Sequence, residues 1–505
     1  MRLTELVKGM ATPLEKQAAD ADREITGLTS DSRKVKPGSL FAALPGAHAD
    51  GRAYVADAIA RGAVALLVQS GFEAAMRAEI AEQQARRTEP AEPIEIPVLG
   101  DDNPRRRFAL LTARFYGGQP ERIAAVTGTN GKTSTVTFAR QLWQAMGENG
   151  ASVGTLGVMS PDYQEPGALT TPDPVELHRI LAELRRRGVD RLAMEASSHG
   201  LDQYRLDGVE LTAAVFTNLT RDHLDYHKTF EAYLGAKLRL FAELLPAHGH
   251  AVINADSPEF EHVAAVARGR RQRILTFGVA GDDVRILEAR PTAAGQHLRL
   301  SVSGQPFDGD LPLIGTFQAA NVAAALGLLL ACGEETEACL RALPALTGVP
   351  GRMELAATLP NGAAVYVDYA HTPDALANAL ASARPHATGR LVTVFGCGGD
   401  RDAGKRPEMG RIAVRLADQV IVTDDNPRSE SAAAIRAAVM AGAAGAAEIG
   451  DRAQAIAAAV DSLQTGDVLL IAGKGHEQGQ IIGDRVIPFD DRTVAREAAR
   501  SRGGR

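Results

Sequence analysis

Short apolar runs recur along the chain, and stretches with helical spacing separate them. The runs span residues 123–126, 192–194, 213–216, 365–367, 391–395, 420–422 and 468–471. Apolar runs of this length between helices are typical of parallel strands that helices cover on both faces. The pattern therefore predicts an α/β fold that is built on parallel sheets.

A cluster of polar or glycine residues follows most of these runs directly. The clusters include residues 127–133 after the first run, Glu195 after the second and residues 425–428 shortly after the sixth. In open parallel sheets, ligands bind outside the carboxyl ends of the strands. Three runs lie in the middle of the chain and four lie near its end. We therefore expect two sheets whose polar edges share one active site.

A chain of 505 residues is expected to fold into two or three domains. The Pro/Glu-rich stretch 86–93 predicts a linker, and the Pro/Gly-punctuated stretch 346–351 predicts a hinge. We therefore expect domains at residues 1–100, 101–346 and 347–505. Helices are expected between residues 101 and 116 and in the alanine-rich stretch 432–447, because alanine is the strongest helix former.

Composition excludes several classes of protein. A net charge of −7 argues against a nucleic-acid partner, and Cys332, Cys339 and Cys397 are too few for a disulfide framework or a zinc site. The longest nearly apolar run, 322–332, is shorter than the roughly 20 residues that cross a bilayer. The first ten residues lack the apolar core of a signal peptide. We expect a cytoplasmic monomer without a membrane segment.

The clearest motif is a glycine-rich loop between a predicted strand and a predicted helix. Its residues are Gly128, Thr129, Asn130, Gly131, Lys132, Thr133 and Ser134. Such a loop turns backbone N–H groups toward phosphate, the helix N-terminus adds positive potential, and Lys132 neutralises charge on the β- and γ-phosphates. A full Walker loop has glycine where this chain has Val126. The alternative is a tight strand–helix turn without a ligand.

Residues 127–133 resemble the shortened phosphate loop of the Mur ligases and of the related folylpolyglutamate synthases. The resemblance continues through essentially the whole chain, in the same order. It implies a UDP-sugar-binding N-terminal domain, a central ATP-binding P-loop domain and a Rossmann-like C-terminal domain that binds an amino acid. It also implies an amide ligase that uses ATP and Mg²⁺ and proceeds through an acyl phosphate.

The resemblance assigns roles around the nucleotide. Thr133, Glu195 and His223 resemble Mg²⁺ ligands, although imidazole is an unusual ligand for this ion. Lys237 resembles the family's N-carboxylated lysine, whereas a lysine on a helix is otherwise read as a solvated charge. Lys132, Glu195, His223 and Lys237 are thus the expected catalytic group. The further expected nucleotide contacts are Asn321, Arg352, Asp368 and His371.

The resemblance also implies that the substrates are UDP-N-acetylmuramoyl-L-alanyl-D-glutamate and meso-diaminopimelate. The expected contacts to the UDP-muramoyl dipeptide are Ser30, Ser32, Ala47, His48, Ala49, Thr170, Thr171, Ser197, Gln203 and Arg205. The expected contacts to diaminopimelate are Arg401, Asp425, Asn426, Pro427, Arg428, Gly473 and Glu477. Diaminopimelate has a second carboxylate that lysine lacks, and the forked guanidinium of Arg428 suits that group.

Two alternatives stay open at the level of sequence. The first is another member of the same superfamily, such as a lysine-adding ligase or a folylpolyglutamate synthase. The motif at Asp425–Arg428 and the N-terminal segment argue against it. The second is a P-loop switch or ATPase that acts as a binding module, which would leave the polar clusters near the chain's end without a purpose. Hydrolysis of nucleotide without an amino acid would favour this second alternative.

Overall fold

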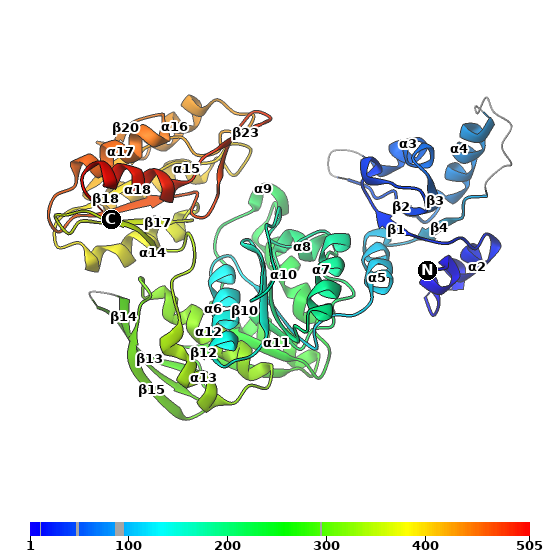
Figure 1. The fold of residues 1–505 in the computed structure, drawn as a ribbon, viewed down its shortest axis with the longest axis horizontal. Coiled ribbons are helices and arrows are strands. Elements are labelled where there is room, and N and C mark those ends of the chain that lie inside the picture. The colour runs from blue at the N-terminus through cyan, green and yellow to red at the C-terminus, as the bar shows by residue number, and fades with distance from the viewer. Residues whose placement is uncertain (11, 47–49, 86–94, 293–294, 505) are drawn as a thin grey trace. The chain divides into compact units, whose positions relative to one another are not determined.

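The computed structural model describes residues 1–10, 12–46, 50–85, 95–292 and 295–504 (Figure 1). These residues form three larger β-sheets and one two-stranded hairpin. The chain divides into two compact units. The first comprises Met1–Glu121, Gly167–Arg191 and His199–Glu210, and the second comprises Arg122–Pro166, Leu192–Ser198 and Leu211–Arg505. The predicted α/β fold class with parallel sheets is confirmed, whereas the predicted linker at 86–93 lies outside the described residues.

The first unit contains a four-stranded parallel sheet. Its strands, in spatial order, are β1 (Gly27–Thr29), β2 (Ser39–Ala42), β3 (Ala63–Gln69) and β4 (Val98–Asp101). One face packs against α1 (Leu3–Val7), α2 (Thr12–Asp20) and α5 (Pro104–Tyr116), and the other against α3 (Val55–Ala60) and α4 (Glu73–Ala85). Neighbouring residues of a strand point to opposite faces, so apolar strands of this kind need a helical layer on each side.

Helix α7 (Pro174–Arg186) also belongs to the first unit, where it packs against α5. The predicted helix before Tyr116 is confirmed as α5, whose N-cap Asn103 accepts a hydrogen bond from the amide of Arg106. The Arg106 guanidinium pairs with the buried Asp207 at 3.0 Å. His178 on α7 contacts the Asp207 carbonyl at 3.1 Å, so one polar segment ties both helices together.

The second unit begins with an eleven-stranded sheet in the order β15-β14-β13-β12-β11-β10-β5-β9-β6-β7-β8. Its middle strands are β5 (Arg122–Thr127), β9 (Arg191–Glu195), β10 (Ala213–Phe216), β11 (His250–Asn254) and β12 (Arg273–Gly278). The flanking strands are β6 (Gly150–Gly154), β7 (Gly157–Met159), β8 (Gln164–Glu165), β13 (Val284–Thr292), β14 (Gly295–Val302) and β15 (Gln305–Leu311). Within each flank, neighbouring strands pair antiparallel. The pairs β5–β10, β10–β11, β11–β12 and β12–β13 are parallel.

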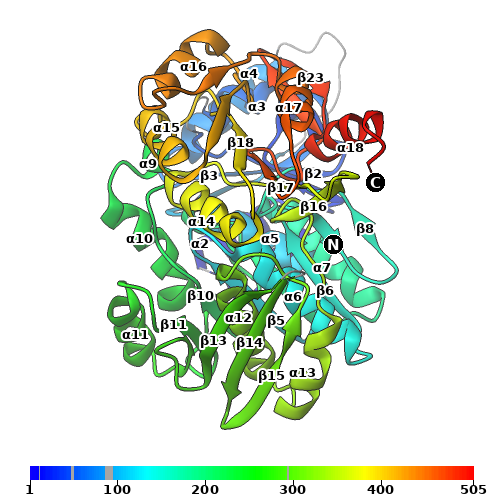
Figure 2. The same ribbon diagram turned by 90° about the vertical axis from the view of Figure 1, so that its left-hand side faces the viewer.

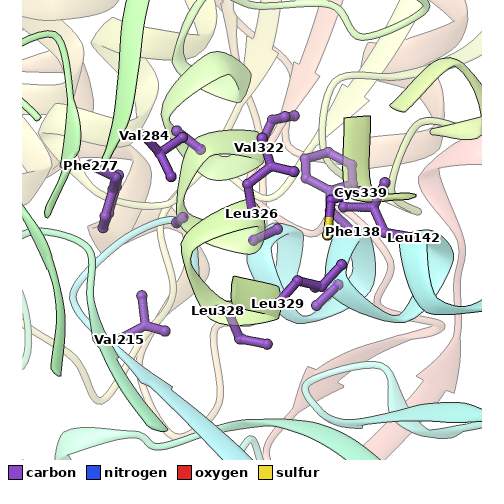
Figure 3. Packing of buried hydrophobic residues seen from close by; sticks show 14 of the residues in the cluster. Phe138, Leu142, Val215, Phe277, Val284, Val322, Leu326, Leu328, Leu329 and Cys339 are labelled. Atoms are coloured by element: carbon purple, nitrogen blue, oxygen red, sulfur yellow. The ribbon is translucent and has the colours of Figure 1, made fainter. Parts of the chain in front are cut away.

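Helices α6 (Lys132–Ala145) and α12 (Phe317–Ala331) pack side by side against one face of this sheet. Figure 3 shows Val322, Leu326 and Leu329 of α12 among Phe138 and Leu142 of α6 and Val215 of β10. These side chains are fully or almost fully buried. The packing fixes α6, and the glycine-rich loop before it, against the end of β5.

The second unit also contains a six-stranded sheet, which is formed by the last part of the chain (Figures 1 and 2). Its order is β16 (Glu354–Thr358), β17 (Ala364–Asp368), β21 (Val468–Ala472), β18 (Leu391–Phe395), β19 (Gln419–Val422) and β20 (Ala447–Glu448), and only β16 is antiparallel. One face packs on α14 (Pro373–Ala383), α15 (Lys405–Leu416) and α16 (Ala432–Met440). The other packs on α17 (Arg452–Ser462) and α18 (Asp491–Ser501).

All seven predicted strands are confirmed, as β5, β9, β10, β17, β18, β19 and β21. The predicted alanine-rich helix 432–447 is too long, because α16 ends at Met440. The residues after it turn tightly: Gly445 has φ +84°, and a side chain on Gly442 would lie 1.9 Å from the Pro407 carbonyl. Within the described part of the chain, no helix combines the length and the apolar character that crossing a bilayer requires.

Candidate active site

The glycine-rich loop connects β5 to α6, as the sequence predicts. Gly128 has φ +147° and Gly131 has φ +88°, conformations that favour glycine. A Cβ on Gly128 would lie 1.9 Å from the Thr217 hydroxyl, and one on Gly131 would lie 2.5 Å from the Asn321 amide oxygen. The two glycines therefore provide both the turn and the close approach, which excludes any larger residue at either position.

Residues after β10 hold the loop from one side. The Thr129 amide donates to the Asn218 carbonyl at 3.0 Å, and the Asn130 amide donates to the Asn218 side chain at 2.9 Å. The Thr129 hydroxyl accepts from the Thr220 amide at 3.0 Å and lies 3.1 Å from the Tyr233 hydroxyl. Asn218, Thr220 and Tyr233 were not among the predicted site residues. Asn218 and Thr220 do belong to a polar cluster after a predicted strand, so the sequence contained a signal for them.

Lys132 opens helix α6, and its ammonium folds back onto the loop. The Nζ atom donates to the carbonyls of Gly128 at 2.8 Å and Thr129 at 2.9 Å. Burial lowers the pKa of this ammonium, Arg352 lowers it further, and the carboxylates of Glu195 and Asp222 act in the opposite sense. Two carboxylates from separate strand ends thus lie within electrostatic reach of the loop lysine.

Arg352 comes from the segment before β16 and reaches the same loop. Its Nη2 donates to the Thr133 hydroxyl at 3.1 Å, and its guanidinium carbon lies 4.4 Å from the centre of the Tyr369 ring. Tyr369 is in turn flanked by the rings of His371 and His476, with centroids 4.6 and 5.3 Å away. A cation over an aromatic face is stabilised by the ring quadrupole. This stack connects the nucleotide loop to the carboxyl edge of the second sheet.

Asn321 and Asp368, both predicted nucleotide contacts, have clear internal partners. The Asn321 amide nitrogen donates to Gln318 at 2.8 Å, while its oxygen faces Gly131. The Asp368 carboxylate accepts from the amides of Met353 and Ala370, both at 2.8 Å. Burial raises the pKa of Asp368, and Arg352 and the two amides oppose that rise. Asp368 therefore shapes the segment that carries Arg352.

Glu195 ends β9 and is almost completely buried. Its carboxylate accepts from the amide of Thr155 at 2.8 Å and from the Thr155 hydroxyl at 3.2 Å. A Cβ on Gly154 would lie 2.2 Å from the Glu195 carboxylate oxygen, so glycine is required opposite it. Hydroxyl and carboxylate oxygens are the ligands that Mg²⁺ prefers. Thr133 and Glu195 therefore fit such an ion chemically.

His223, the third predicted metal ligand, precedes α9 (Leu224–His227) and adopts φ +54°. Its Nε2 lies 3.4 Å from the Asp222 carboxylate, and Nε2 of His371 lies 3.9 Å from the same group. Burial by itself would raise the pKa of Asp222, but His223, His371 and Lys405 outweigh it and hold that pKa at about 2. Asp222 is thus a half-buried anion beside the loop, and sequence reasoning did not single it out.

Lys237 lies on α10 (Phe230–Arg239) and is not the solvated helix charge that its position alone would suggest. The side chain is 1% exposed, its Nζ donates to the Gly128 carbonyl at 2.9 Å, and it lies 4.4 Å from the centre of the Tyr233 ring. Burial and the neighbouring Lys132 hold the pKa of Lys237 well below its usual value, although Asp222 opposes them. A buried lysine whose charged form is disfavoured therefore lies directly behind the phosphate loop.

Two side-chain contacts join the loop region to the last sheet. The side-chain amide of Asn130 donates to the carboxylate of Asp374, at the start of α14, at 3.0 Å. Arg221 pairs with Asp402 at 3.3 Å. Together with the bond from Arg352 to Thr133, they bring the carboxyl edges of both sheets of the second unit to one place, as the sequence predicts.

The residues that are predicted to bind the amino-acid substrate lie at the carboxyl ends of β18, β19 and β21. Arg428 has φ +52°, and its Nη1 donates to the Gly399 carbonyl at 2.8 Å. Burial lowers the pKa of Arg428, Arg401 adds to the lowering, and Asp425, Glu477 and Asp400 oppose it. Two guanidinium groups and two buried or half-buried carboxylates, Asp425 and Glu477, therefore lie within electrostatic reach of one another.

Gly473 and Pro427 complete this group. A Cβ on Gly473 would lie 2.6 Å from the Asp425 carboxylate, and the Gly473 amide donates to the Asp368 carbonyl at 3.1 Å. Pro427 is buried, and its carbonyl would lie 1.9 Å from a Cβ on Gly399. The polypeptide is therefore packed backbone to backbone where the three strand ends meet.

The first unit contains most of the predicted muramoyl-peptide residues. Ser30 is exposed and Ser32 is buried, on either side of Asp31 after β1. Arg205 donates to the Thr171 carbonyl at 2.8 Å and to the Gln203 side chain at 2.7 Å, next to the half-buried Thr170. The half-buried Ser197 belongs to the second unit. Ala47, His48 and Ala49 lie outside the described residues.

The strand–loop–helix geometry, the two lysines at the loop and the carboxyl edges that meet beside it define a phosphate-loop α/β enzyme. Three family models match successive parts of the chain. "Mur ligase family, catalytic domain" matches residues 24–116, "Mur ligase middle domain" matches 126–329, and "Mur ligase, glutamate ligase domain" matches 351–475.

Curated relatives match almost the whole chain. The UDP-N-acetylmuramoyl-L-alanyl-D-glutamate–2,6-diaminopimelate ligase of Agrobacterium fabrum is 51% identical over 94% of this chain and 93% of its own. The ligase of the same name from Rhizobium meliloti is 50% identical over 99% of both chains. A solved structure of a ligase of that name is 35% identical, with a TM-score of 0.65 over 95% of each chain. The chain belongs to the Mur ligase family.

Proposed function

We propose that the protein is an ATP-dependent amide ligase that adds meso-diaminopimelate to UDP-N-acetylmuramoyl-L-alanyl-D-glutamate in the assembly of cell-wall precursor. The observation that carries the proposal is the pairing of a phosphate loop with a second sheet edge that presents Arg428, Arg401, Asp425 and Glu477 together. Curated relatives that are about half identical to the chain are named for this reaction. We further propose that it acts as a cytoplasmic monomer without a nucleic-acid partner.

The reaction first needs an activated carboxylate, because a carboxylate and an amine do not join spontaneously in water. An oxygen of the glutamyl carboxylate attacks the γ-phosphorus of ATP and releases ADP, which leaves an acyl phosphate. The amine of diaminopimelate then attacks the acyl carbon, and the tetrahedral intermediate expels phosphate as the nitrogen loses a proton. Such steps depend on positioning and charge stabilisation rather than on a protein nucleophile.

Each group of residues has a task in this scheme. The amides of the loop and the Lys132 ammonium bind the β- and γ-phosphates. Arg352 enters from the second sheet and contacts Thr133, so it is well located to respond to the nucleotide. Thr133 and Glu195 would hold Mg²⁺, with His223 as a further ligand, and the bound ion would neutralise phosphate charge. Asn321, Asp368 and His371 would line the nucleotide site.

Each substrate would be recognised by its own group of residues. Ser30, Ser32, Thr170, Thr171, Ser197, Gln203 and Arg205, with Ala47, His48 and Ala49, are the proposed contacts to the UDP-muramoyl dipeptide. The forked guanidinium of Arg428 would bind the distal carboxylate of diaminopimelate, and Arg401 would serve the other end. Gly473 and Glu477 would receive the ammonium and the backbone of the distal centre, beside Asp425.

Lys237 would act as a carbamate. A neutral amine adds to CO₂, whereas an ammonium does not, so the lowered pKa of this buried lysine favours the modification. The carbamate would place an anion behind the phosphate loop, where it can help to position the acyl phosphate. Mass spectrometry under mild conditions should detect a loss of CO₂ from the peptide that contains Lys237. An unmodified lysine in fully active enzyme would contradict this role.

Phosphate release with defined substrate sets tests the proposed function. With ATP and Mg²⁺, release should require UDP-N-acetylmuramoyl-L-alanyl-D-glutamate and meso-diaminopimelate together, and L-lysine should replace diaminopimelate poorly. Transfer of ¹⁸O from the glutamyl carboxylate to phosphate would test the acyl phosphate. Equal use of lysine would point to a lysine-adding ligase, and release without any amino acid would point to a simple ATPase.

A further inference from the structure

Lys474 is a fully buried cation beside the proposed amino-acid site. Its side chain is 0% exposed, and it follows the carboxyl end of β21 directly after Gly473. The Nζ atom donates to the Asn426 amide oxygen at 2.8 Å and to Oε2 of Glu477 at 3.2 Å. A buried charge is costly unless it is paired and hydrogen-bonded. Lys474 therefore fixes the two residues that satisfy it.

Asn426, the second residue of the Asp425–Arg428 motif, has its side chain engaged within the protein. Its oxygen accepts from Lys474 and from the Ile481 amide at 2.9 Å, and its nitrogen donates to Oε2 of Glu477 at 2.8 Å. An asparagine side chain offers two donor hydrogens and two acceptor lone pairs, and three of these four are used here. Asn426 is therefore well suited to orient Glu477.

The hairpin of β22 (Gly479–Ile482) and β23 (Arg485–Pro488) closes the same network. The Gln480 side chain donates to the Asp425 carbonyl at 2.8 Å, and the Arg428 amide donates to the Ile481 carbonyl at 3.1 Å. Arg428 and Glu477 are thus held by one framework. Arg428 is held by its backbone and by the bond from its guanidinium to the Gly399 carbonyl, whereas the Glu477 carboxylate is held by Lys474 and Asn426.

We infer that Lys474, both directly and through Asn426, is a positioning residue that sets the Glu477 carboxylate for the distal ammonium of the amino-acid substrate. Both internal donors bind Oε2 of Glu477, and the ammonium would be received at Oε1. This inference rests on the proposed function. It divides recognition of the distal centre in two: Arg428 reads the carboxylate, and the Lys474–Asn426–Glu477 network reads the ammonium.

Two analogues of meso-diaminopimelate separate these roles, because 2-aminopimelate lacks the distal amine and L-lysine lacks the distal carboxylate. The measured quantity is the ratio of kcat/KM for diaminopimelate to that for each analogue, with each analogue tested as substrate and as competitor. Lys474→Met should lower the diaminopimelate to 2-aminopimelate ratio by about tenfold, the usual size of an interaction with a charged group. It should leave the ratio to lysine and the KM for ATP within about twofold.

Asn426→Asp provides a second variant of nearly the same size. It keeps acceptors for Lys474 and the Ile481 amide but replaces the donor to Glu477 by a carboxylate oxygen, and it should lower the same ratio. Arg390→Met is a matched control. Arg390 pairs at 2.6 Å with Asp467, which directly precedes the amino end of β21, whereas Lys474 follows the carboxyl end. The control should leave both ratios unchanged.

The outcomes are distinct. Wild-type enzyme that does not ligate diaminopimelate at all would refute the proposed function itself. Wild-type enzyme that ligates diaminopimelate but does not prefer it over 2-aminopimelate would overturn only the role of Glu477 and Lys474. Equal loss with both analogues in the folded variants would mean a general structural role and would also overturn the inference. If Lys474→Met does not fold, the ratio measured with Asn426→Asp decides.

Discussion

The phosphate loop and the amino-acid region both lie at the carboxyl ends of parallel strands, yet they are built in opposite ways. The loop is one contiguous segment that uses backbone amides and a single lysine, because phosphate needs little more than N–H groups and positive charge. The amino-acid region combines the ends of β18, β19 and β21 with the β22–β23 hairpin. Its selectivity depends on side chains from distant segments that buried polar bonds hold in place.

In this chain a contiguous motif is sufficient for phosphate binding, whereas selectivity for the amino acid depends on residues that the fold brings together. Asn426 and Lys474 are 48 residues apart in the chain, and Lys474 and Glu477 are only three apart. Changes in the loop should therefore abolish turnover with any amino acid. Changes around Arg428 and Glu477 should alter the choice of amino acid and leave the nucleotide step intact.

The largest expected effect is that of Lys132→Met. Removing the loop ammonium withdraws charge stabilisation from the transferred phosphoryl group, so kcat should fall by about 10³-fold with every amino acid. Steady-state phosphate release measures the change. Arg140→Met is a control on the same helix, since Arg140 bonds to Gln144 rather than to the loop. A variant that lost activity with diaminopimelate but kept it with another amino acid would contradict the assignment of the loop to the nucleotide step alone.

The second-largest effect is expected at a buried ion pair that contacts the strand ends of the amino-acid region. Arg452 and Asp491 form a fully buried ion pair at 2.7 Å, and Arg452 also donates to the carbonyls of Asp424 and Ala472, directly before Asp425 and Gly473. Arg452→Met leaves the buried Asp491 carboxylate unpaired and should lower the free energy of unfolding by about 3–5 kcal/mol.

The protection of the β19 and β21 amides against hydrogen exchange measures this loss of stability at the strand ends. The exposed pair of Arg384 and Asp418 supplies the control, because Arg384→Met should cost less than about 1 kcal/mol. Unchanged protection in the Arg452 variant would mean that this ion pair does not support the strand ends.

The smallest effect is expected at the contact between Arg221 and Asp402, which joins the loop region to the last sheet. The Arg221 side chain is 51% exposed, so water and salt screen the pair. Arg221→Ala should change kcat/KM by less than about fivefold, and added salt should reduce even that difference. A much larger loss would indicate that this ion pair, rather than Arg352 and Asn130, holds the two sheets together.

The central parts of the fold could be predicted because their signals are local. Seven buried parallel strands are continuous apolar runs, and the loop is a contiguous motif between a strand and a helix. The antiparallel strands β13–β15 escaped prediction because they alternate exposed and buried residues and contain Pro291 and Pro306. The end of α16 was misplaced because its alanines favour a helix, while Gly442 and Gly445 turn the chain.

The candidate site was predictable only where its residues follow a strand. Lys132, Glu195 and Arg428 do so, and the structure brings the first two within electrostatic reach of each other. Tyr369 and Lys474 also follow strands, but Arg352 over the Tyr369 ring and Asn426 beside Lys474 come from other segments, and no local pattern indicates those two partners. Lys237 was expected from resemblance alone, because its burial depends on the three-dimensional packing of α10 against the loop.

The most direct test of the account is the amino-acid preference of Arg428→Ala together with its nucleotide affinity. We expect the ratio of kcat/KM for meso-diaminopimelate to that for L-lysine to fall at least about tenfold, since a charged hydrogen bond is lost. The dissociation constant for ATP should stay within about twofold of the wild-type value. A preserved preference, or a parallel loss of nucleotide affinity, would contradict the division of work between the two sheet edges.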